Sequence, residues 1–289
     1  MSMNSLIEQA ARRLEQLRQA GADMPVVNGA GLPNASPGAA PAVAPKRPAH
    51  VVELDLERLA QAGYLTPLAP RSQVADQFRV VKRPLIRNAV GKQSQDIVRG
   101  NLIMVTSAKP GEGKTFTAIN LAMSLATEQD TTVLLVDADV TRPAVMDVLG
   151  LPRSAGLMDL LQDPSVRLAD TLVRTNIDKL SLLPSGTPHP RATEMLASDA
   201  MAALLQEMAS RYANRIIVFD SPPLLLATES RVLATHMGQI VMVVQAEQTL
   251  QSDVHAALAT IDSCPVRLML LNQARKAAAT GYDYAPAAA

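Results

Sequence analysis

In the middle of the chain, an apolar strand runs directly into a glycine-rich turn and then into a helix. Residues 101–105 supply β-branched and apolar side chains, residues 107–115 read SAKPGEGKT, and residues 116–126 repeat apolar side chains at helical spacing. A turn of this kind before a helix N-terminus directs backbone N–H groups at a phosphate. The sequence therefore predicts a nucleotide-binding protein.

Each residue type in the turn has a chemical role. Gly111 and Gly113 let the backbone curl around a phosphate. The Lys114 ammonium can reach the β- and γ-phosphates, and the Thr115 hydroxyl can ligate Mg²⁺. Ala108 takes the place of the first glycine of the usual pattern, and it is small enough for that position. The residues predicted to contact nucleotide here are Gly111, Glu112, Gly113, Lys114, Thr115 and Phe116.

Two further apolar strands end in carboxylates. The run VLLVDADVTRP contains Asp137 and Asp139, and the run IIVFDSPP contains Asp220. Because doubly wound sheets bind ligands at the carboxyl ends of their strands, we expect all three near the glycine-rich turn. Asp137 is the predicted base, Asp139 its neighbour near the metal, and Asp220 a Mg²⁺ ligand acting through water. Together with Lys114 they form the predicted catalytic set, and together with Thr115 the predicted metal site.

Strand-like and helix-like segments alternate along the second two thirds of the chain. The predicted strands are residues 102–106, 132–136, 180–183, 215–219, 239–245 and 267–271. This alternation predicts an α/β fold with a doubly wound, mainly parallel sheet and helices on both faces. Aromatic residues make up only 2% of the chain, so its core must consist of aliphatic side chains and methionine. The single cysteine, Cys264, excludes an internal disulfide.

The chain divides into five predicted segments. These are an N-terminal amphipathic helix (1–21), a Pro/Ala-rich flexible linker (22–50), a helical and basic segment (51–100), the nucleotide-binding domain (101–273) and a disordered tail (274–289). Within the third segment we expect helices at 52–63 and 72–89, with Pro84 kinking or dividing the second. We expect no signal peptide or membrane span, so membrane association would come through a partner. A net charge of zero gives no reason to expect nucleic-acid binding.

The motifs SAKPGEGKT, LLVDADVTRP and VFDSPPLL together resemble the Walker A, Walker A′ and Walker B motifs of the bacterial tyrosine kinases, which are P-loop relatives of the MinD/ParA ATPases. The linker and the segment FRVVKRPLI are most similar to the exosortase-associated tyrosine autokinases of exopolysaccharide biosynthesis. The resemblance implies ATP and Mg²⁺ as cofactors and a homo-oligomer. It also implies a membrane polysaccharide co-polymerase as activator, and a cytoplasmic protein that is peripheral at the membrane through that partner.

The resemblance also assigns roles to individual residues. Tyr282 and Tyr284 of the tail would be the autophosphorylation sites, and Asn272 would lie on the adenine side of the nucleotide. Arg142 would replace the arginine of the D-x-D-x-R motif, because Thr141 occupies the usual position. The oligomerisation motif E-x-x-R-x-x-R is matched by Asp76, Arg79 and Lys82.

Two alternative functions stay open. One is a MinD/ParA-like ATPase whose output is a dimerisation switch, and the other is a nucleotide-dependent scaffold with negligible turnover. Lys109 coincides with the signature lysine of the MinD/ParA group, which reaches into the other subunit's nucleotide site. In the kinases this position varies, so we expect Lys109 to face solvent.

Overall fold

The computed structural model describes residues 51–68, 71–90, 97–211 and 214–274. All of them belong to one compact unit, Pro48–Ala289. The predicted N-terminal helix, the linker and both tail tyrosines lie outside the described residues. Within the described ranges, no helix is both long enough and apolar enough to cross a bilayer.

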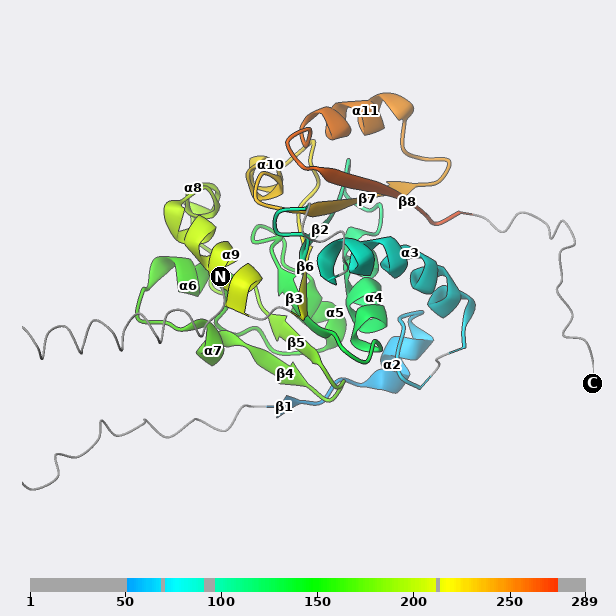
Figure 1. Ribbon diagram of the computed structural model, residues 1–289, viewed down its shortest axis with the longest axis horizontal. Coiled ribbons are helices and arrows are strands. Elements are labelled where there is room, and N and C mark those ends of the chain that lie inside the picture. Colours follow the sequence, from blue (N-terminus) through cyan, green and yellow to red (C-terminus); the bar gives the residue numbers. More distant parts are fainter. Residues whose placement is uncertain (1–50, 69–70, 91–96, 212–213, 275–289) are drawn as a thin grey trace, which may run out of the picture. The chain divides into compact units, whose positions relative to one another are not determined.

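The described residues form an eight-stranded sheet in the order β1-β4-β5-β3-β6-β2-β7-β8 (Figure 1). Neighbouring strands are parallel except for β4 and β5, which are antiparallel. The strands are β1 (Val51–Val52), β2 (Leu102–Ser107), β3 (Thr132–Asp137), β4 (Val173–Thr175), β5 (Leu180–Leu183), β6 (Arg215–Asp220), β7 (Gln239–Gln245) and β8 (Val266–Asn272). The predicted doubly wound, mainly parallel sheet is therefore confirmed, and each predicted strand agrees within one residue at either end. Strands β1 and β4 are not among the predicted strands.

Helices cover both faces of this sheet (Figure 1). They are α2 (Leu56–Gln61), α3 (Gln73–Val90), α4 (Lys114–Ala126), α5 (Val145–Leu149), α6 (Leu157–Gln162), α7 (Leu168–Thr171), α8 (Ala192–Leu196), α9 (Asp199–Arg211), α10 (Thr228–Ala234) and α11 (Gln251–Ala259). Alternate residues of β2 enter opposite cores: Ile103 and Val105 pack with α3 and α4, whereas Leu102 and Met104 pack with α9 and α10. Strands buried on both faces explain why the sequence shows continuous apolar runs.

The described residues before β2 belong to the core on the α3–α4 side of the sheet, where Leu59, Phe78 and Leu85 are buried. The helix expected at 52–63 begins only at Leu56, because the Asp55 side chain caps it by accepting a hydrogen bond from the Arg58 N–H. Val51–Val52 instead forms a parallel strand pair with β4. Helix α3 continues through Pro84, so the proline does not divide it.

Lys82 is a buried cation on the inner face of α3. Its side chain is 4% exposed and forms an ion pair with Glu128 at 2.7 Å. Its ammonium also donates to the Ser124 carbonyl oxygen at 2.6 Å and to the Thr127 hydroxyl at 3.0 Å. These acceptors lie at the C-terminal end of α4, where a cation is favoured. Lys82 therefore holds α3 to α4 within one subunit, and it is not available for the intersubunit role that the sequence motif suggests.

Candidate active site

The glycine-rich turn adopts the conformation that its glycines predict. Helix α4 begins at Lys114, and its N-cap, Gly113, has φ of 92°. Gly111 has φ of 85°. Both values lie in the left-handed region that residues with a Cβ rarely adopt. A Cβ on Gly113 would also come within 2.1 Å of the Asn272 Nδ2 atom, so a side chain fits there neither in conformation nor in space.

Side chains from later strands and helices hold this turn in place. The buried Glu112 carboxylate accepts hydrogen bonds from the Lys109 N–H at 2.8 Å and from the Thr249 hydroxyl. Asn272, at the end of β8, donates to the Glu112 carbonyl oxygen at 2.9 Å. The Lys109 ammonium, 49% exposed, forms an ion pair with Asp253 of α11 at 2.5 Å. The side chain of Glu112 thus supports the loop, and Lys109 faces solvent only in part.

The three predicted carboxylates come together at the end of the sheet. Asp137 and Asp220 are register partners at the ends of β3 and β6, and β6 lies beside the strand that leads into the turn. Both are fully buried, and Asp139 is only 4% exposed. The Lys114 ammonium donates to Asp139 Oδ2 at 2.9 Å. The sheet therefore collects three carboxylates around one lysine, as the sequence predicts.

The hydrogen bonds of these carboxylates are incomplete. Asp139 Oδ1 accepts from the Arg142 N–H at 3.0 Å, and Asp137 Oδ2 accepts from the Val145 N–H at 3.0 Å. Asp137 Oδ1 and both Asp220 oxygens have no hydrogen-bond partner of normal geometry among the described residues. Burying an unpartnered carboxylate oxygen is costly, so such oxygens indicate a site that awaits a ligand.

Burial changes the acidity of this cluster. It raises the pKa of the Asp137 carboxyl to about 7, helped by the nearby Asp220 carboxylate. Burial also raises the pKa of Asp220 to about 6, although the Lys114 ammonium and the Thr115 side chain favour its charged form. For Lys114, burial opposes the charge, but the Asp220 and Asp139 carboxylates outweigh it and raise its pKa. A carboxyl with a pKa near neutrality suits a group that takes up a proton during catalysis.

The donor set fits a magnesium ion that shares its ligands with a nucleotide. Mg²⁺ prefers oxygen ligands and commonly binds one or two carboxylates, phosphate oxygens and several waters. The unpartnered oxygens of Asp137 and Asp220, beside the Thr115 hydroxyl, are ligands of this kind. No cluster of three or more His, Cys, Asp or Glu side chains that could hold a metal by itself occurs in the described part of the chain.

The other predicted site residues differ in how they contact the glycine-rich turn and the carboxylate cluster. Asn272 contacts the turn directly, and its place on the adenine side of a nucleotide stays a prediction. Arg142 reaches the carboxylate cluster through its backbone, while its side chain is exposed. The Phe116 ring packs on Tyr64 with 5.1 Å between ring centroids and belongs to the α3–α4 core. Only the backbone of Phe116 therefore remains for a nucleotide.

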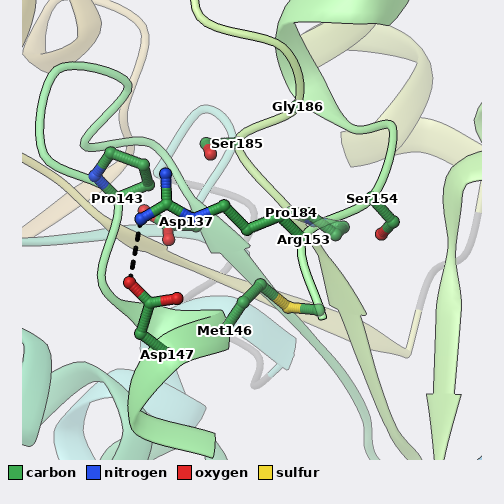
Figure 2. A pocket seen from close by; sticks show the side chains of 9 residues that line it. All are labelled: Asp137, Pro143, Met146, Asp147, Arg153, Ser154, Pro184, Ser185 and Gly186. Atoms are coloured by element: carbon green, nitrogen blue, oxygen red, sulfur yellow. Dashed lines mark hydrogen bonds and ion pairs between the residues drawn. The ribbon is translucent and has the colours of Figure 1, made fainter. Parts of the chain in front are cut away.

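A small pocket opens beside Asp137, and the sequence analysis did not predict it (Figure 2). Its wall comes from three segments: the start of α5 with Met146 and Asp147, the following loop with Arg153, and the loop after β5 with Ser185. Ser185 is 7% exposed. The wall residues of the two loops and the start of α5 belong to no sequence motif, so no pattern in the chain could have identified them.

Comparison with known proteins agrees with this geometry. A family model described as an AAA domain matches residues 100–273, more than half of the chain. The tyrosine-protein kinase YwqD of Bacillus subtilis is 28% identical over 226 residues, which cover 78% of this chain and 91% of YwqD. The tyrosine-protein kinase Wzc of Salmonella typhimurium is 30% identical over 189 residues, which cover 64% of this chain but only 26% of Wzc.

A solved structure extends the likeness to three dimensions. The crystal structure of the VpsO kinase domain superimposes with a TM-score of 0.58 at 27% identity, covering 69% of this chain and 95% of that one. Residues 100–273, which the family model matches, contain the turn, the three carboxylates and the strands β3 and β6 that bring Asp137 and Asp220 together. The chain therefore belongs to the AAA domain family and, within it, to the P-loop bacterial tyrosine kinases.

Proposed function

We propose that this protein is an ATP-dependent tyrosine autokinase that phosphorylates the tail tyrosines of a neighbouring copy. The observation that carries the proposal is the carboxylate cluster at the ends of β3 and β6. Asp137 and Asp220 are buried, incompletely hydrogen-bonded and next to Lys114 at the start of α4. A nucleotide phosphate, a metal and a hydroxyl nucleophile would satisfy these groups together.

In the proposed reaction, the tyrosine oxygen attacks the γ-phosphorus of ATP. A bond forms between these two atoms, and the bond from the γ-phosphorus to the bridging oxygen breaks, so that ADP leaves with the electron pair. The phenol proton passes to the Asp137 carboxylate, whose raised pKa makes it an effective acceptor near neutral pH. Lys114 would exchange its bond to Asp139 for the phosphates, and the backbone N–H groups of residues 111–115 would orient them.

Mg²⁺, held by Thr115 and Asp220, would neutralise the charge that develops on the phosphates. Asp139 would keep the Arg142 segment in place through its bond to the Arg142 N–H. Asn272, which contacts the glycine-rich turn, would face the adenine side of the nucleotide. Apart from Phe116, each of the predicted site residues on the described part of the chain thus has a role in the proposal.

The position of β8 supports transfer between subunits. This strand ends at Asn272, which contacts the turn itself, and Tyr282 follows ten residues later. Ten residues span at most about 35 Å when fully extended, and a flexible chain of that length averages about 18 Å. Return to the same site would need a tight reversal, whereas a neighbour's site can be reached without one.

A mixing experiment tests the proposal. One chain carries Lys114→Met and keeps its tyrosines, and the other is active but carries Tyr282→Phe and Tyr284→Phe. After incubation with MgATP, we expect phosphate at Tyr282 or Tyr284 of the Lys114→Met chain. Peptide mapping by mass spectrometry locates it, and a pull-down with two different tags establishes that mixed oligomers form.

One control and two possible results separate the alternatives. The Lys114→Met chain alone should acquire no phosphate, because the lysine supplies the charge at the phosphates. ATP hydrolysis without any phosphotyrosine would instead favour a MinD/ParA-like ATPase switch. Nucleotide binding without turnover would favour a scaffold.

We further propose the setting of this kinase. It would act as a homo-oligomer in the cytoplasm, at the inner face of the membrane only through a partner, and it would regulate exopolysaccharide biosynthesis or export. A membrane polysaccharide co-polymerase would be the activator. Because Lys82 is bound within its own subunit, Arg79 and the other exposed cations of α3 are the residues left to form the interface.

A further inference from the structure

The pocket beside Asp137 has an arginine at its rim. Asp137 lies at the end of β3, and Arg153 belongs to the loop between α5 and α6. Both residues line the pocket, and Figure 2 shows the Arg153 guanidinium among Pro143, Asp137 and Asp147. Asp147 raises the pKa of Arg153 through its hydrogen bond and its charge, and the charge of Asp137 adds to this rise. A substrate group that approaches Asp137 from the side of this pocket would therefore meet a guanidinium.

Arg153 has one internal counter-ion and capacity for another. Its Nη2 atom donates to Asp147 Oδ2 at 2.9 Å, and the two side chains are 64% and 56% exposed. A guanidinium has five N–H donors, and one ion pair leaves most of them to solvent. A second carboxylate could therefore bind Arg153 without first breaking the bond to Asp147.

Without Arg153, the pocket would repel anions. Its other charged members, Asp137 and Asp147, are both carboxylates. Arg153 is the one cation among the described residues that line the pocket, so it decides whether an acidic group is attracted or repelled there. Ser185 adds a hydroxyl to the pocket wall, which suits a polar group of a bound peptide.

The tail provides a matching sequence. Asp283 stands between Tyr282 and Tyr284, so each tyrosine has a carboxylate as its direct neighbour. We propose that Arg153, at the rim of the small pocket beside Asp137, selects acceptor tyrosines that carry an adjacent carboxylate. The inference rests on the proposed kinase function and names the substrate class of that site: a tyrosine next to an aspartate or glutamate.

Peptide kinetics with the full-length chain test this role. The enzyme carries Tyr282→Phe and Tyr284→Phe, so that it has no tail acceptor of its own. The peptide copies residues 278–286 with phenylalanine in place of Tyr284, and three versions carry Asp, Asn or Lys at position 283. The ratio of kcat/KM between peptides is the readout, because effects on nucleotide binding or folding cancel within each enzyme variant.

We expect the Asp peptide to be preferred over the Asn peptide by about 3- to 5-fold, the range for an exposed ion pair. The preference should shrink when ionic strength rises from about 0.05 M to about 0.5 M. Arg153→Ala should bring the ratio to 1 or below, because Asp137 and Asp147 then repel the peptide. Arg153→Glu should reverse the order, so that the Lys peptide becomes the best substrate, which a purely structural role would not cause.

Two matched variants complete the test. Arg167→Ala removes an exposed arginine that pairs with Asp170 in the same way but lies outside the pocket, and it should keep the full preference. Asp147→Asn removes a carboxylate that repels the peptide carboxylate beside Arg153, and it should increase the preference.

Three results would overturn the inference. A wild-type ratio of 1 would show that the neighbouring carboxylate is not recognised. An equal loss of rate on all peptides in Arg153→Ala would mean that the arginine acts on the phosphoryl group instead. Both results leave the kinase function intact. If the enzyme with Arg153 intact phosphorylates none of the peptides and the tail also stays unmodified in the mixing experiment, the proposed function fails and the inference falls with it.

Discussion

The buried charged groups at the two ends of helix α4 differ in whether their hydrogen bonds are satisfied. At the C-terminal end, the Lys82 ammonium has three partners, contributed by Ser124, Thr127 and Glu128. At the N-terminal end, Asp220 is fully buried and neither of its oxygens has a partner of normal geometry. A buried charge with all its hydrogen bonds made stabilises one structure, whereas an unpartnered one costs stability until a ligand arrives. This difference distinguishes Lys82, which stabilises the fold, from Asp220, which is placed to bind a ligand.

The comparison predicts opposite phenotypes for substitutions at the two ends. The largest effect should be on catalysis. Asp137→Asn should preserve much of the nucleotide binding but lower the rate of phosphoryl transfer by about 10²- to 10⁴-fold, since an amide cannot accept the tyrosine proton. Single-turnover transfer with nucleotide prebound measures this loss, and the unfolding midpoint shows whether the fold is intact.

Asp220→Asn is the matched control for that experiment, and it should chiefly change the concentration of Mg²⁺ required. If the Asp137→Asn chain transferred phosphate normally with ATP bound, Asp139 would become the candidate base. That result would also remove the functional meaning of the raised pKa of Asp137.

At the other end of α4, the largest effect should be on stability. Lys82→Met keeps most of the apolar stem but leaves the acceptors at the end of α4 without their donor. We expect the free energy of unfolding to fall by about 1–3 kcal/mol, the cost of leaving buried hydrogen-bonding groups unsatisfied. Urea denaturation measures it. Arg83→Met, at the exposed next position of α3, should change stability little, and equal losses in both variants would refute the contrast.

The buried carboxylates should also show in the pH dependence of stability. The folded-state pKa of Asp137, about 7, lies above its ordinary value of 3.8. Its protonated form therefore favours the folded state, and this contribution is present below pH 3.8 and is lost as the pH rises through about 7. In the absence of nucleotide and Mg²⁺, Asp137→Asn should then stabilise the protein at pH 8, because it removes a buried charge. The gain should be about 1–2 kcal/mol, since the buried amide of the new side chain lacks hydrogen-bond partners and offsets part of it.

The stabilisation should shrink as the pH is lowered towards 5, where the wild-type carboxyl holds its proton. Thermal unfolding at several pH values measures it. Asp163→Asn, at an exposed carboxylate whose pKa is lowered by its bonds to Ser165, should show no gain at pH 8. A gain for Asp137→Asn that did not depend on pH would mean that charge is not its cause.

Much of this arrangement could be predicted from the sequence, because it is carried by local patterns. Central strands of a parallel sheet are continuous apolar runs, and the carboxylates follow these runs directly, so Asp137 and Asp220 could be assigned to the same edge of the sheet. The two-residue strand β1 and the three-residue β4 were missed, because such short segments have no periodicity of their own. Their pairing depends on neighbours far away in the chain.

Lys82 and Arg153 show the limit of reading charges by position. A lysine in a basic, amphipathic helix favours an exposed site, and only the end of α4 beside it explains why this one is buried. Arg153 lies in a loop without any motif, and its possible role depends on Asp147 and Asp137, which reach it from other elements. Tertiary partners decide both cases, and one sequence does not reveal them.

The smallest effect should come from the pair of Lys109 and Asp253. This pair is partly exposed, so Asp253→Asn should lower the free energy of unfolding by no more than about 1 kcal/mol. Because Lys109 is bound within its own subunit, Lys109→Ala should leave phosphotyrosine formation within about two-fold of wild type, and neither variant should change nucleotide-dependent self-association. Sedimentation velocity with and without MgATP measures the second property. If Lys109 instead acts across a dimer, as in the MinD/ParA group, Lys109→Ala would abolish ATP turnover and Asp253→Asn, by releasing the lysine, would strengthen nucleotide-dependent dimers. The two substitutions would then have opposite effects on nucleotide-dependent function. Lys109, in the glycine-rich turn, would have to be counted among the functional charges and not among the structural ones.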